Sequence, residues 1–216
     1  DQATADAISM INRSTDEMMK LISDLIDFSS SGLGRAMPLH REPVDLEVLC
    51  GEVVDSFRAT HPDRTLSLRS DGDVDGEWDA GRIRQVVSNL LGNAIQHGSP
   101  DSPITLSLTP RQLPSEGATL GASLVVLSVH NEGAEIPADH LPNIFDPLKR
   151  YATQDSAAQR RPGSIGLGLY IAREIVEAKG GTVTVTSSAA PGTTFTVCLP
   201  RFRPVDGGAG DDAEAA

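Results

Sequence analysis

Several features that mark common protein classes are scarce in this chain of 216 residues. Cysteine occurs only at Cys50 and Cys198, both in apolar surroundings, so we interpret both as reduced core residues and not as a disulfide framework. Aromatic residues make up 4% of the chain. No apolar run approaches the roughly 20 residues that cross a bilayer, and no signal peptide is visible. We therefore expect a cytoplasmic protein without a membrane segment.

Positive charge is also in short supply, because 30 acidic residues outnumber 18 Lys and Arg and give a net charge of −12. Nucleic-acid binding depends on basic stripes, so nucleic acid is not expected as a partner. The chain lacks an initiator Met, which leads us to expect a piece of a longer protein. Residues 204–216 are rich in Gly, Ala and Asp, and we expect them to form a disordered acidic tail.

The first 30 residues have the apolar spacing of a helix that packs against another helix. A heptad seam follows Ile8, Ile11, Met18, Ile22 and Leu25. Such a seam has to be buried, and this chain offers no second heptad helix. We therefore expect its partner to be another chain or a missing segment. A Ser- and Gly-rich linker, 29–38, follows.

From residue 39 onward the pattern alternates between helices and strands and predicts an α+β domain. Asp45 is a good cap for a helix that reaches Thr60. A second helix begins near Asp79 and is stopped by Gly98 and Pro100. A third helix is expected over 167–178, a short one over 138–141, a turn over 71–76 and a hairpin loop over 110–121. The expected strands are a short one that leads to Asp45, and 65–69, 104–108, 124–129, 182–186 and 194–199.

The second helix carries the most informative pattern in the chain. Gln85, Asn89, Asn93 and His97 are spaced four residues apart and stack on one face. The core row of the same helix is Ile83, Val87, Leu90 and Ala94. Each buried amide must find a partner, and an amide oxygen is a hard donor that suits a magnesium ion carrying phosphates. The alternative is an ordinary polar face exposed to solvent.

Three loops after this helix are compatible with a bound polyphosphate. In the first, 129–137, an apolar strand ends at Asn131 and a glycine allows close approach of the backbone. In the second, 145–150, an aromatic residue and a proline can anchor a mobile loop whose basic end, Lys149 and Arg150, would face phosphates, the alternative being a solvated basic pair. In the third, 163–169, glycines lead into a helix whose N-terminal N–H groups and dipole favour an anion. The polar stretch before these glycines suggests a lid.

In this order the motifs resemble the catalytic, ATP-binding domain of sensor histidine kinases, in the superfamily of gyrase, Hsp90, histidine kinases and MutL. The segments that carry the resemblance are Asn89–Ala94, Asn131–Glu135, Phe145–Leu148, Gly166–Gly168 and Gly192–Phe195. The resemblance covers about 39–201, and 14–28 resembles the second helix of the family's dimerisation hairpin. The sequences of the helix and of the stretch from Val129 to Gly133 are most similar to those of kinases attached to bacterial phytochromes.

The resemblance implies a fold, a domain division and partners. The fold is a two-layer α/β sandwich, with a mixed, mostly antiparallel sheet and three helices on one face, preceded by a long coiled-coil-type helix. Residues 1–36 would be the hairpin helix and linker, 37–203 the ATP-binding catalytic domain and 204–216 the tail. ATP and Mg2+ are the implied cofactors. The implied partners are the dimerisation and phosphoacceptor helix of the same or a partner kinase chain, a response-regulator receiver domain, and a second copy in an intact homodimer.

The resemblance also assigns roles by position. Asn93 would ligate magnesium, Asn89 would assist at the phosphates and Arg150 would steady them from the base of the lid, so Asn93 and Arg150 are the implied catalytic residues. Asn131 would meet the adenine amino group and Gly133 would lie against the ring. The other residues implied at the nucleotide are Gln96, His97, Ile136, Phe145, Lys149, Gly166, Leu167, Gly168, Leu169 and Thr194, with the Gly166 and Gly168 backbone at the β- and γ-phosphates and Thr194 beside the base.

The chain departs from the family's pattern at positions that bear on nucleotide binding. The adenine-reading Asp is Asn131 here, and an amide donates as well as accepts, so we predict weaker discrimination between ATP and GTP. Gln96 replaces a Lys and removes one positive charge. Glu135 replaces the second Gly of its motif, and Leu148 replaces a Phe. The phosphoacceptor His is absent, so this chain alone is not expected to autophosphorylate.

Two other functions remain compatible with the sequence. One is a nucleotide-binding regulatory module, or pseudokinase, that signals without transferring phosphate, and it is motivated by Asn131, Glu135 and Gln96. The other is a serine kinase of the anti-sigma type, which shares the nucleotide fold. The heptad helix at the N-terminus disfavours the second of these, because such proteins do not need it.

Overall fold

The computed structural model describes residues 40–112, 123–149 and 166–201, together with isolated positions before residue 30 (4, 8, 15, 18, 19, 22, 25, 26, 28 and 29). The helices of the described part are α2 (Leu46–Thr60), α3 (Ala80–His97), a short 3-10 helix η1 (Leu141–Asn143) and α4 (Gly168–Glu177). Its strands are β1 (Glu42–Asp45), β2 (Leu66–Ser70), β3 (Asp75–Trp78), β4 (Ile104–Gln112), β5 (Ser123–Asn131), β6 (Thr182–Ser187) and β7 (Thr193–Pro200).

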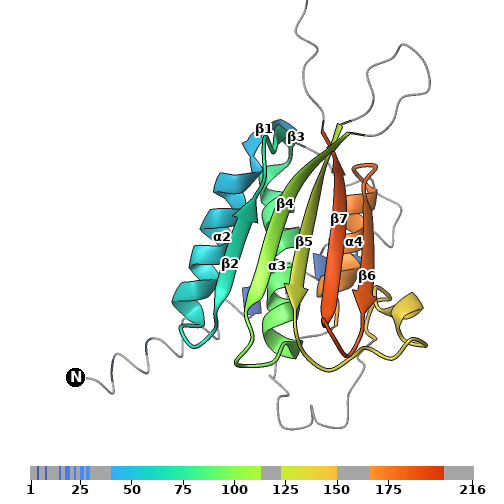
Figure 1. Ribbon diagram of the computed structural model, residues 1–216. Helices are drawn as coiled ribbons and strands as arrows, with labels where there is room; N and C mark the ends of the chain where they lie inside the picture. Colours follow the sequence, from blue (N-terminus) through green and yellow to red (C-terminus); the bar gives the residue numbers. More distant parts are fainter. Residues whose placement is uncertain are drawn as a thin grey trace, which may run out of the picture.

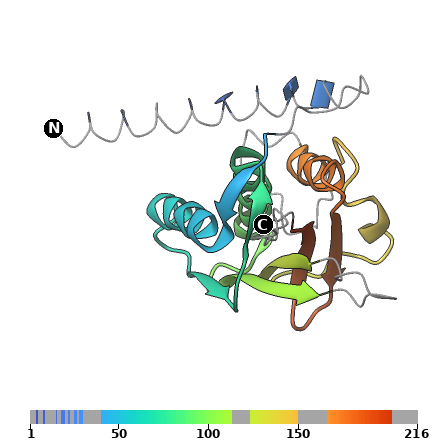
Figure 2. The same ribbon diagram turned by 90° about the horizontal axis from the view of Figure 1, so that it is seen from above.

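Five of the strands form one sheet in the order β2-β4-β5-β7-β6. The first pair, β2 and β4, is parallel, and the other neighbours are antiparallel. The helices α2, α3 and α4 lie side by side on one face of this sheet (Figures 1 and 2). The prediction of an α+β fold, with a mixed, mostly antiparallel sheet and three helices on one face, is confirmed.

The core lies between the helices and the sheet. In β5 and β7 every second residue is fully buried, and the two strands bring these residues into adjacent rows, as at Val129 and Phe195. The helices supply matching apolar rows, of which Ile83, Val87 and Leu90 on α3 are completely buried. This alternation is typical of an antiparallel sheet covered on one face only.

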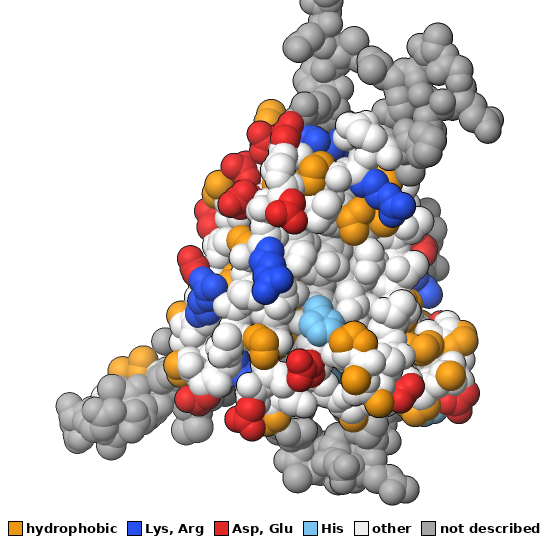
Figure 3. Space-filling model, viewed as in Figure 1, with side chains coloured by type: hydrophobic (Ala, Val, Ile, Leu, Met, Phe, Trp, Pro, Cys, Tyr) orange, Lys and Arg blue, Asp and Glu red, His pale blue; other side chains and the backbone are white. Residues whose placement is uncertain are grey.

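The opposite face of the sheet is polar and carries little charge. Its half-buried residues include Thr105, Ser107, Ser128, Thr194 and Thr196, which alternate with the core positions. The centre of this face is largely uncharged in Figure 3. No helix of the described part covers it, which is why hydroxyl side chains occupy it.

The strand β3 was not predicted, because the sequence pattern indicates a turn over 71–76. In the structure β3 pairs antiparallel with β1 in a separate two-stranded sheet. Its last residue, Trp78, is almost completely buried and donates from Nε1 to the carbonyl of Pro200 at 2.9 Å. The strand therefore depends on partners distant in sequence, which explains why its Asp- and Gly-containing composition did not reveal it.

The helix expected over 1–30 lies largely outside the described residues, as do the linker before residue 40, the lid segment 150–165 and the tail. Among the described positions, Ile8, Met18, Ile22 and Leu25 of the heptad seam are 54–56% exposed. Phe28 packs edge-to-face on Tyr170 of α4, with ring centroids 5.7 Å apart. In the part of the chain that is described, no helix is long and apolar enough to span a membrane.

Candidate nucleotide-binding site

The helix α3 is the main support of the candidate site. Its first turn is capped by Asp79, whose carboxylate accepts from the backbone N–H of Arg82 at 3.0 Å. The apolar row packs into the core and fixes the rotation of the helix, so the polar row is directed toward α4. Asn89, in the middle of that row, is only 4% exposed. The polar row is therefore not the ordinary solvent-exposed face that was the alternative.

The side chain of Asn89 lies in the seam between α3 and α4. A Cβ atom added at Gly168 would lie 3.4 Å from Oδ1 of Asn89, so the glycine lets the two helices approach closely at this point. The amide nitrogen Nδ2 is buried and finds no hydrogen-bond partner among the residues that the structure describes. An unpaired buried donor costs about 1–3 kcal/mol, which a ligand oxygen in the seam would offset.

The remaining members of the row follow the helix out to the surface. Gln85 is engaged within α3, where Arg82 donates from Nη1 to its Oε1 at 2.9 Å. Asn93 and Gln96 are half-buried, and His97 at the end of the helix is exposed. Along the polar row, exposure therefore increases from the buried Asn89 through the half-buried Asn93 to the exposed His97.

The N-terminus of α4 differs from those of the other two helices. Asp45 and Asp79 cap α2 and α3 with side-chain hydrogen bonds, whereas α4 begins after Leu167 without a side-chain cap. Its first N–H groups therefore receive no side-chain cap from the residues that the structure describes and can serve another acceptor. Gly166, with φ of 77°, turns the chain into this helix in a conformation that favours glycine. An uncapped helix start next to Asn89 is a suitable place for phosphate oxygens.

The rim of the sheet supplies the second half of the site. Asn131, the last residue of β5, is 4% exposed and lies opposite Thr193 of β7, which is 5% exposed. Nδ2 of Asn131 donates to the carbonyl of Glu132 at 3.3 Å, which leaves Oδ1 as its accepting atom. Gly192 has φ of 121°, and a Cβ atom there would overlap the carbonyl oxygen of Asn131. The glycine is therefore required for β7 to start beside Asn131.

Two residues of this rim were missed by the sequence reasoning. The hydroxyls of Ser187 and Thr193 are hydrogen-bonded at 2.8 Å, and the same Ser187 oxygen accepts from the backbone N–H of Ile136 at 2.9 Å. These bonds tie the loop after β5 to the ends of β6 and β7. The alternation of β7 could have revealed Thr193, because it shares a face with the buried Phe195.

Thr194, which was expected beside the base, does not share the face of the sheet on which Asn131 lies. Neighbouring residues of a strand point to opposite faces, and Thr194 lies on the polar face away from the helices. There its hydroxyl is hydrogen-bonded to Nδ1 of His130 at 2.9 Å. The hydroxyl on the same face of the sheet as Asn131, directly opposite it in the strand register, is that of Thr193.

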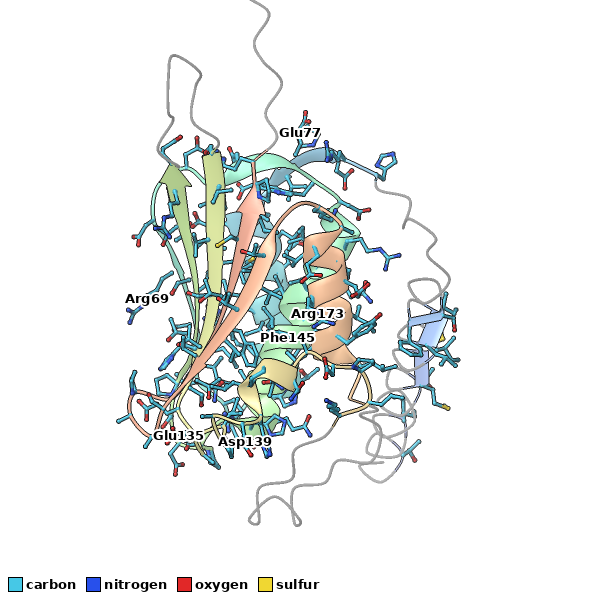
Figure 4. All side chains as sticks on the ribbon, turned by 90° about the vertical axis from the view of Figure 1, so that its right-hand side faces the viewer. Arg69, Glu77, Glu135, Asp139, Phe145 and Arg173 are labelled. Atoms are coloured by element: carbon cyan, nitrogen blue, oxygen red, sulfur yellow. The ribbon has the colours of Figure 1, made fainter. Side chains whose placement is uncertain are left out.

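The loop from β5 to the lid is anchored as expected by Phe145. This residue is 8% exposed and contacts Phe195 edge-to-face, with centroids 6.1 Å apart. In Figure 4, Phe145 points into the interior near α4, whereas Glu135 and Asp139 lie at the rim of the molecule. The aromatic contact therefore fastens this loop to the core a few residues before the segment that was expected to form a lid.

The two ends of the lid segment meet next to this anchor. The backbone N–H of Leu148 donates to the carbonyl of Gly166 at 3.3 Å, so the chain leaves and re-enters the described part at almost the same place. Lys149 donates from Nζ to Asp146 at 2.6 Å. Arg150, the expected lid-base cation, lies outside the described residues. Leu167 is in the core and Leu169 is half-buried.

The chemistry available for a cation at this site is that of amide oxygens. No group of three or more His, Cys, Asp or Glu within the described residues could hold a metal ion. A magnesium ion that keeps most of its waters and is carried by phosphates needs only one or two protein oxygens. Asn93, half-buried beside Asn89, offers one such oxygen, so the residues present fit this kind of metal site.

The residues on both sides of the seam between α3 and α4 lie in a stretch of sequence that matches a known family. A model of the histidine kinase-, DNA gyrase B- and HSP90-like ATPases matches residues 78–203, more than half of the chain. The chain belongs to this family. The matched part contains α3, the rim of β5 and β7, and the uncapped start of α4, and it is an ATP-binding catalytic domain of the histidine kinase type.

Curated relatives narrow the kind of ATPase. The probable sensor histidine kinase TcrY of Mycobacterium tuberculosis is 36% identical over 205 residues, which are 92% of this chain and 39% of that protein. CusS, a sensor histidine kinase of Escherichia coli strain K12, is 33% identical over 85% of this chain and 35% of its own length. The chain thus spans well under half of the relatives it matches. A bacteriophytochrome of Pseudomonas aeruginosa is 30% identical and is one of several such relatives, so the expected special likeness to phytochrome kinases is not supported.

Solved structures agree on the fold. The catalytic domain of the histidine kinase ThkA superposes with a TM-score of 0.59 at 25% identity, covering 76% of this chain and 99% of that domain. Full-length ShkA, solved in complex with AMPPNP, superposes with a TM-score of 0.67 at 24% identity over 89% of this chain and 37% of ShkA. The likeness to ShkA supports the fold alone.

Proposed function

We propose that this chain binds Mg-ATP in the seam between α3 and α4. The observation that carries the proposal is the buried, unpaired Nδ2 of Asn89, on a side chain whose Oδ1 lies against Gly168 at the uncapped start of α4. Together they offer a side-chain donor and backbone donors to the same small space. Phosphate oxygens are acceptors only and would satisfy both groups at once.

The base would occupy the rim of β5 and β7. Asn131 would accept from the adenine amino group through Oδ1, the atom that its bond to Glu132 leaves available. Thr193 lies on the same side of the sheet as Asn131 and is the proposed neighbour of the base in place of Thr194. Gly133 would lie against the ring, because a glycine there keeps the loop close to the end of α3.

Magnesium is the proposed metal, with Asn93 as its protein ligand. When bound, the ion would neutralise negative charge on the phosphates. The chain's own residues would do the rest by positioning: Asn89 and the first N–H groups of α4 would orient the phosphates. We propose that Arg150 and Lys149 add positive charge from the base of the lid.

For the intact protein we propose the reaction of a two-component sensor kinase. The γ-phosphoryl would pass from ATP to a His on a dimerisation helix, and from there to an Asp of a response-regulator receiver domain. In this division, residues 1–36 belong to the dimerisation hairpin of a homodimer and 37–203 form the catalytic domain. The curated relatives, which are sensor histidine kinases much longer than this chain, support the proposal.

A regulatory module without phosphotransfer is the second candidate, and three substitutions favour it. Asn131 replaces the family's Asp, Gln96 removes a Lys, and Glu135 replaces a Gly at the rim. If these changes prevent a productive complex, ATP would only shift the conformation of the lid or the N-terminal helix.

A phosphotransfer experiment separates the two candidates. The chain is mixed with ATP labelled on the γ-phosphoryl group and with a helical hairpin that carries a His followed by an acidic residue. A kinase gives an acid-labile, base-stable label on the hairpin, and Asn93→Ala removes that label. ATP binding without any label would support the regulatory module.

A further inference from the structure

An arginine outside the family's motifs lies close to Asn131, where the nucleotide base is proposed to bind. Arg64 stands in the loop before β2, and its Nη1 donates to the carbonyl of Gly98, the residue that ends α3, at 3.3 Å. Its Nε and Nη2 are also buried and have no hydrogen-bond partner among the described residues. Burial lowers the pKa of this guanidinium, and the negative charge of Asp101 partly opposes the effect.

The partner of Arg64 belongs to a backbone junction between α3 and the rim. Gly98 forms an isolated antiparallel bridge with Gly133, and the next N–H, that of Ser99, donates to the carbonyl of Glu132 at 2.7 Å. Neither glycine has room for a side chain. A Cβ atom would lie 2.5 Å from the carbonyl oxygen of Ala94 at Gly98, and 2.6 Å from that of His97 at Gly133.

Arg64 and Asn131 both lie next to this junction. A Cβ atom at Gly98 would lie 3.0 Å from Nη2 of Arg64 and 3.2 Å from Cβ of Asn131. The guanidinium is therefore a close neighbour of the residue that would read the base, on the same side of Gly98. Arg64 is half-buried, and its buried Nε and Nη2 have no partner among the described residues. Unpaired buried donors cost free energy, so stability alone does not account for an arginine at this place.

We propose that Arg64 is a positioning residue for nucleotide selection. It holds the Gly98–Gly133 junction in place and thereby positions the side chain of Asn131 to accept from the adenine amino group. The inference rests on the proposed function, because it assumes that a base lies at Asn131. Arg64 does not touch the phosphates or the metal in this arrangement. Its loss should therefore weaken recognition of the base and leave the magnesium dependence of binding unchanged.

The test compares ATP with purine riboside triphosphate, which lacks the amino group, in calorimetric titrations with magnesium. The wild-type chain should prefer ATP, and Arg64→Met should lower that preference by about fivefold, since one well-placed hydrogen bond is worth about 1 kcal/mol. Arg64→Lys keeps the charge without the planar fork of the guanidinium. Its preference for ATP should lie between those of the wild-type chain and Arg64→Met. Arg69→Met is the matched control, because Arg69 is exposed and projects from the face of the sheet away from the helices (Figure 4).

The outcomes distinguish this inference from the proposed function. If the wild-type chain prefers ATP and Arg64→Met retains the full preference, the positioning role is wrong while the nucleotide site stands. If the wild-type chain binds neither nucleotide, the proposed function itself fails. If Arg64→Met shows no cooperative thermal transition and so does not fold, Arg64→Lys is the deciding variant. An unchanged preference for ATP over purine riboside triphosphate in Arg64→Lys overturns the role of the guanidinium fork.

Discussion

At the residue that would read the base, an amide stands where a carboxylate would restrict the choice of nucleotide. Asn131 accepts through Oδ1 while its Nδ2 is bound to the carbonyl of Glu132. Guanine would need the amide turned over, which breaks that bond, so ATP should be preferred, but by less than ~100-fold because the turned amide can still pair with guanine.

Asn131→Asp should raise the preference for ATP over GTP by about tenfold, because a carboxylate cannot donate to the guanine carbonyl. Competition binding of ATP and GTP to both proteins measures the ratio. A ratio that is equal in the two proteins, or a wild-type preference above ~100-fold, contradicts this account of the amide.

Backbone strain is visible at Leu148, at the base of the lid. This residue has φ of 63° and is 58% exposed, so it adopts a left-handed conformation with little burial in return. That conformation costs a residue with a side chain roughly 1–2 kcal/mol. Leu148→Gly should stabilise the chain by about 0.5–1 kcal/mol, after allowance for the greater freedom of glycine in the unfolded state.

Urea unfolding of Leu148→Gly beside Leu148→Ala isolates the effect of the backbone. The alanine variant loses the same side chain but keeps the strain, so it should not be more stable than the wild-type chain. A glycine variant no more stable than the alanine variant would show that the left-handed conformation costs little here.

The sequence was informative at residues whose role follows from spacing, and less so where the role depends on strand register. Asn89 and Asn93 were predicted together because the helical period places them on one face. Thr194 was chosen in place of Thr193 by its position in the family's motif, although the alternation of β7 puts Thr193 on the face of the buried Phe195. Arg64 had no signal at all, since its partner Gly98 is distant in sequence and is reached only in the folded chain.

At the scale of elements, the cap of α3 carries a stabilising charge. Partial burial alone would raise the pKa of the Asp79 carboxyl. Two influences outweigh it and lower the pKa: hydrogen bonds from the backbone N–H groups of Arg82 and His40, and the positive charges of Lys179 and Arg82. Asp79→Ala should destabilise the chain by about 1 kcal/mol. Asp79→Asn, which keeps a capping oxygen, should destabilise it less.

The pH dependence of the difference between wild type and Asp79→Asn follows from the lowered pKa. The charged cap contributes its full stability above the ordinary Asp value of about 3.9. The contribution is lost as the pH falls through the lower pKa of the folded state. Unfolding free energies of both proteins from neutral to acidic pH test this, and a difference that grows on acidification would be inconsistent with it.

The helices and strands also differ in how well they can be predicted from the sequence. Helices α2 and α3 have a capping Asp and a clear apolar period, and both were predicted to within about two residues. The strand β3 has neither, and it exists through its pairing with β1 and the burial of Trp78. A strand formed by such distant contacts cannot be predicted from its own four residues.

At the scale of the whole molecule, the described positions of the N-terminal heptad seam are exposed apolar residues. Ile22 and Leu25 are more than half exposed at described positions before the catalytic domain. We expect weak, concentration-dependent self-association through this seam, which Ile22→Glu removes. Val48→Glu, at an exposed apolar residue of α2, is the control and should leave self-association unchanged. Sedimentation equilibrium over a range of concentrations measures it, and a wild-type chain that stays monomeric throughout would show that the seam does not pair with itself.

The central claim is that the seam between α3 and α4 binds Mg-ATP, and calorimetric titration with a non-hydrolysable ATP analogue tests it most directly. Titrations are made with and without magnesium, on the wild-type chain and on Asn93→Ala. The account predicts magnesium-dependent binding that Asn93→Ala abolishes, with thermal stability nearly unchanged because Asn93 is only half-buried. Absence of binding at millimolar nucleotide, or binding indifferent to both magnesium and Asn93, would contradict it.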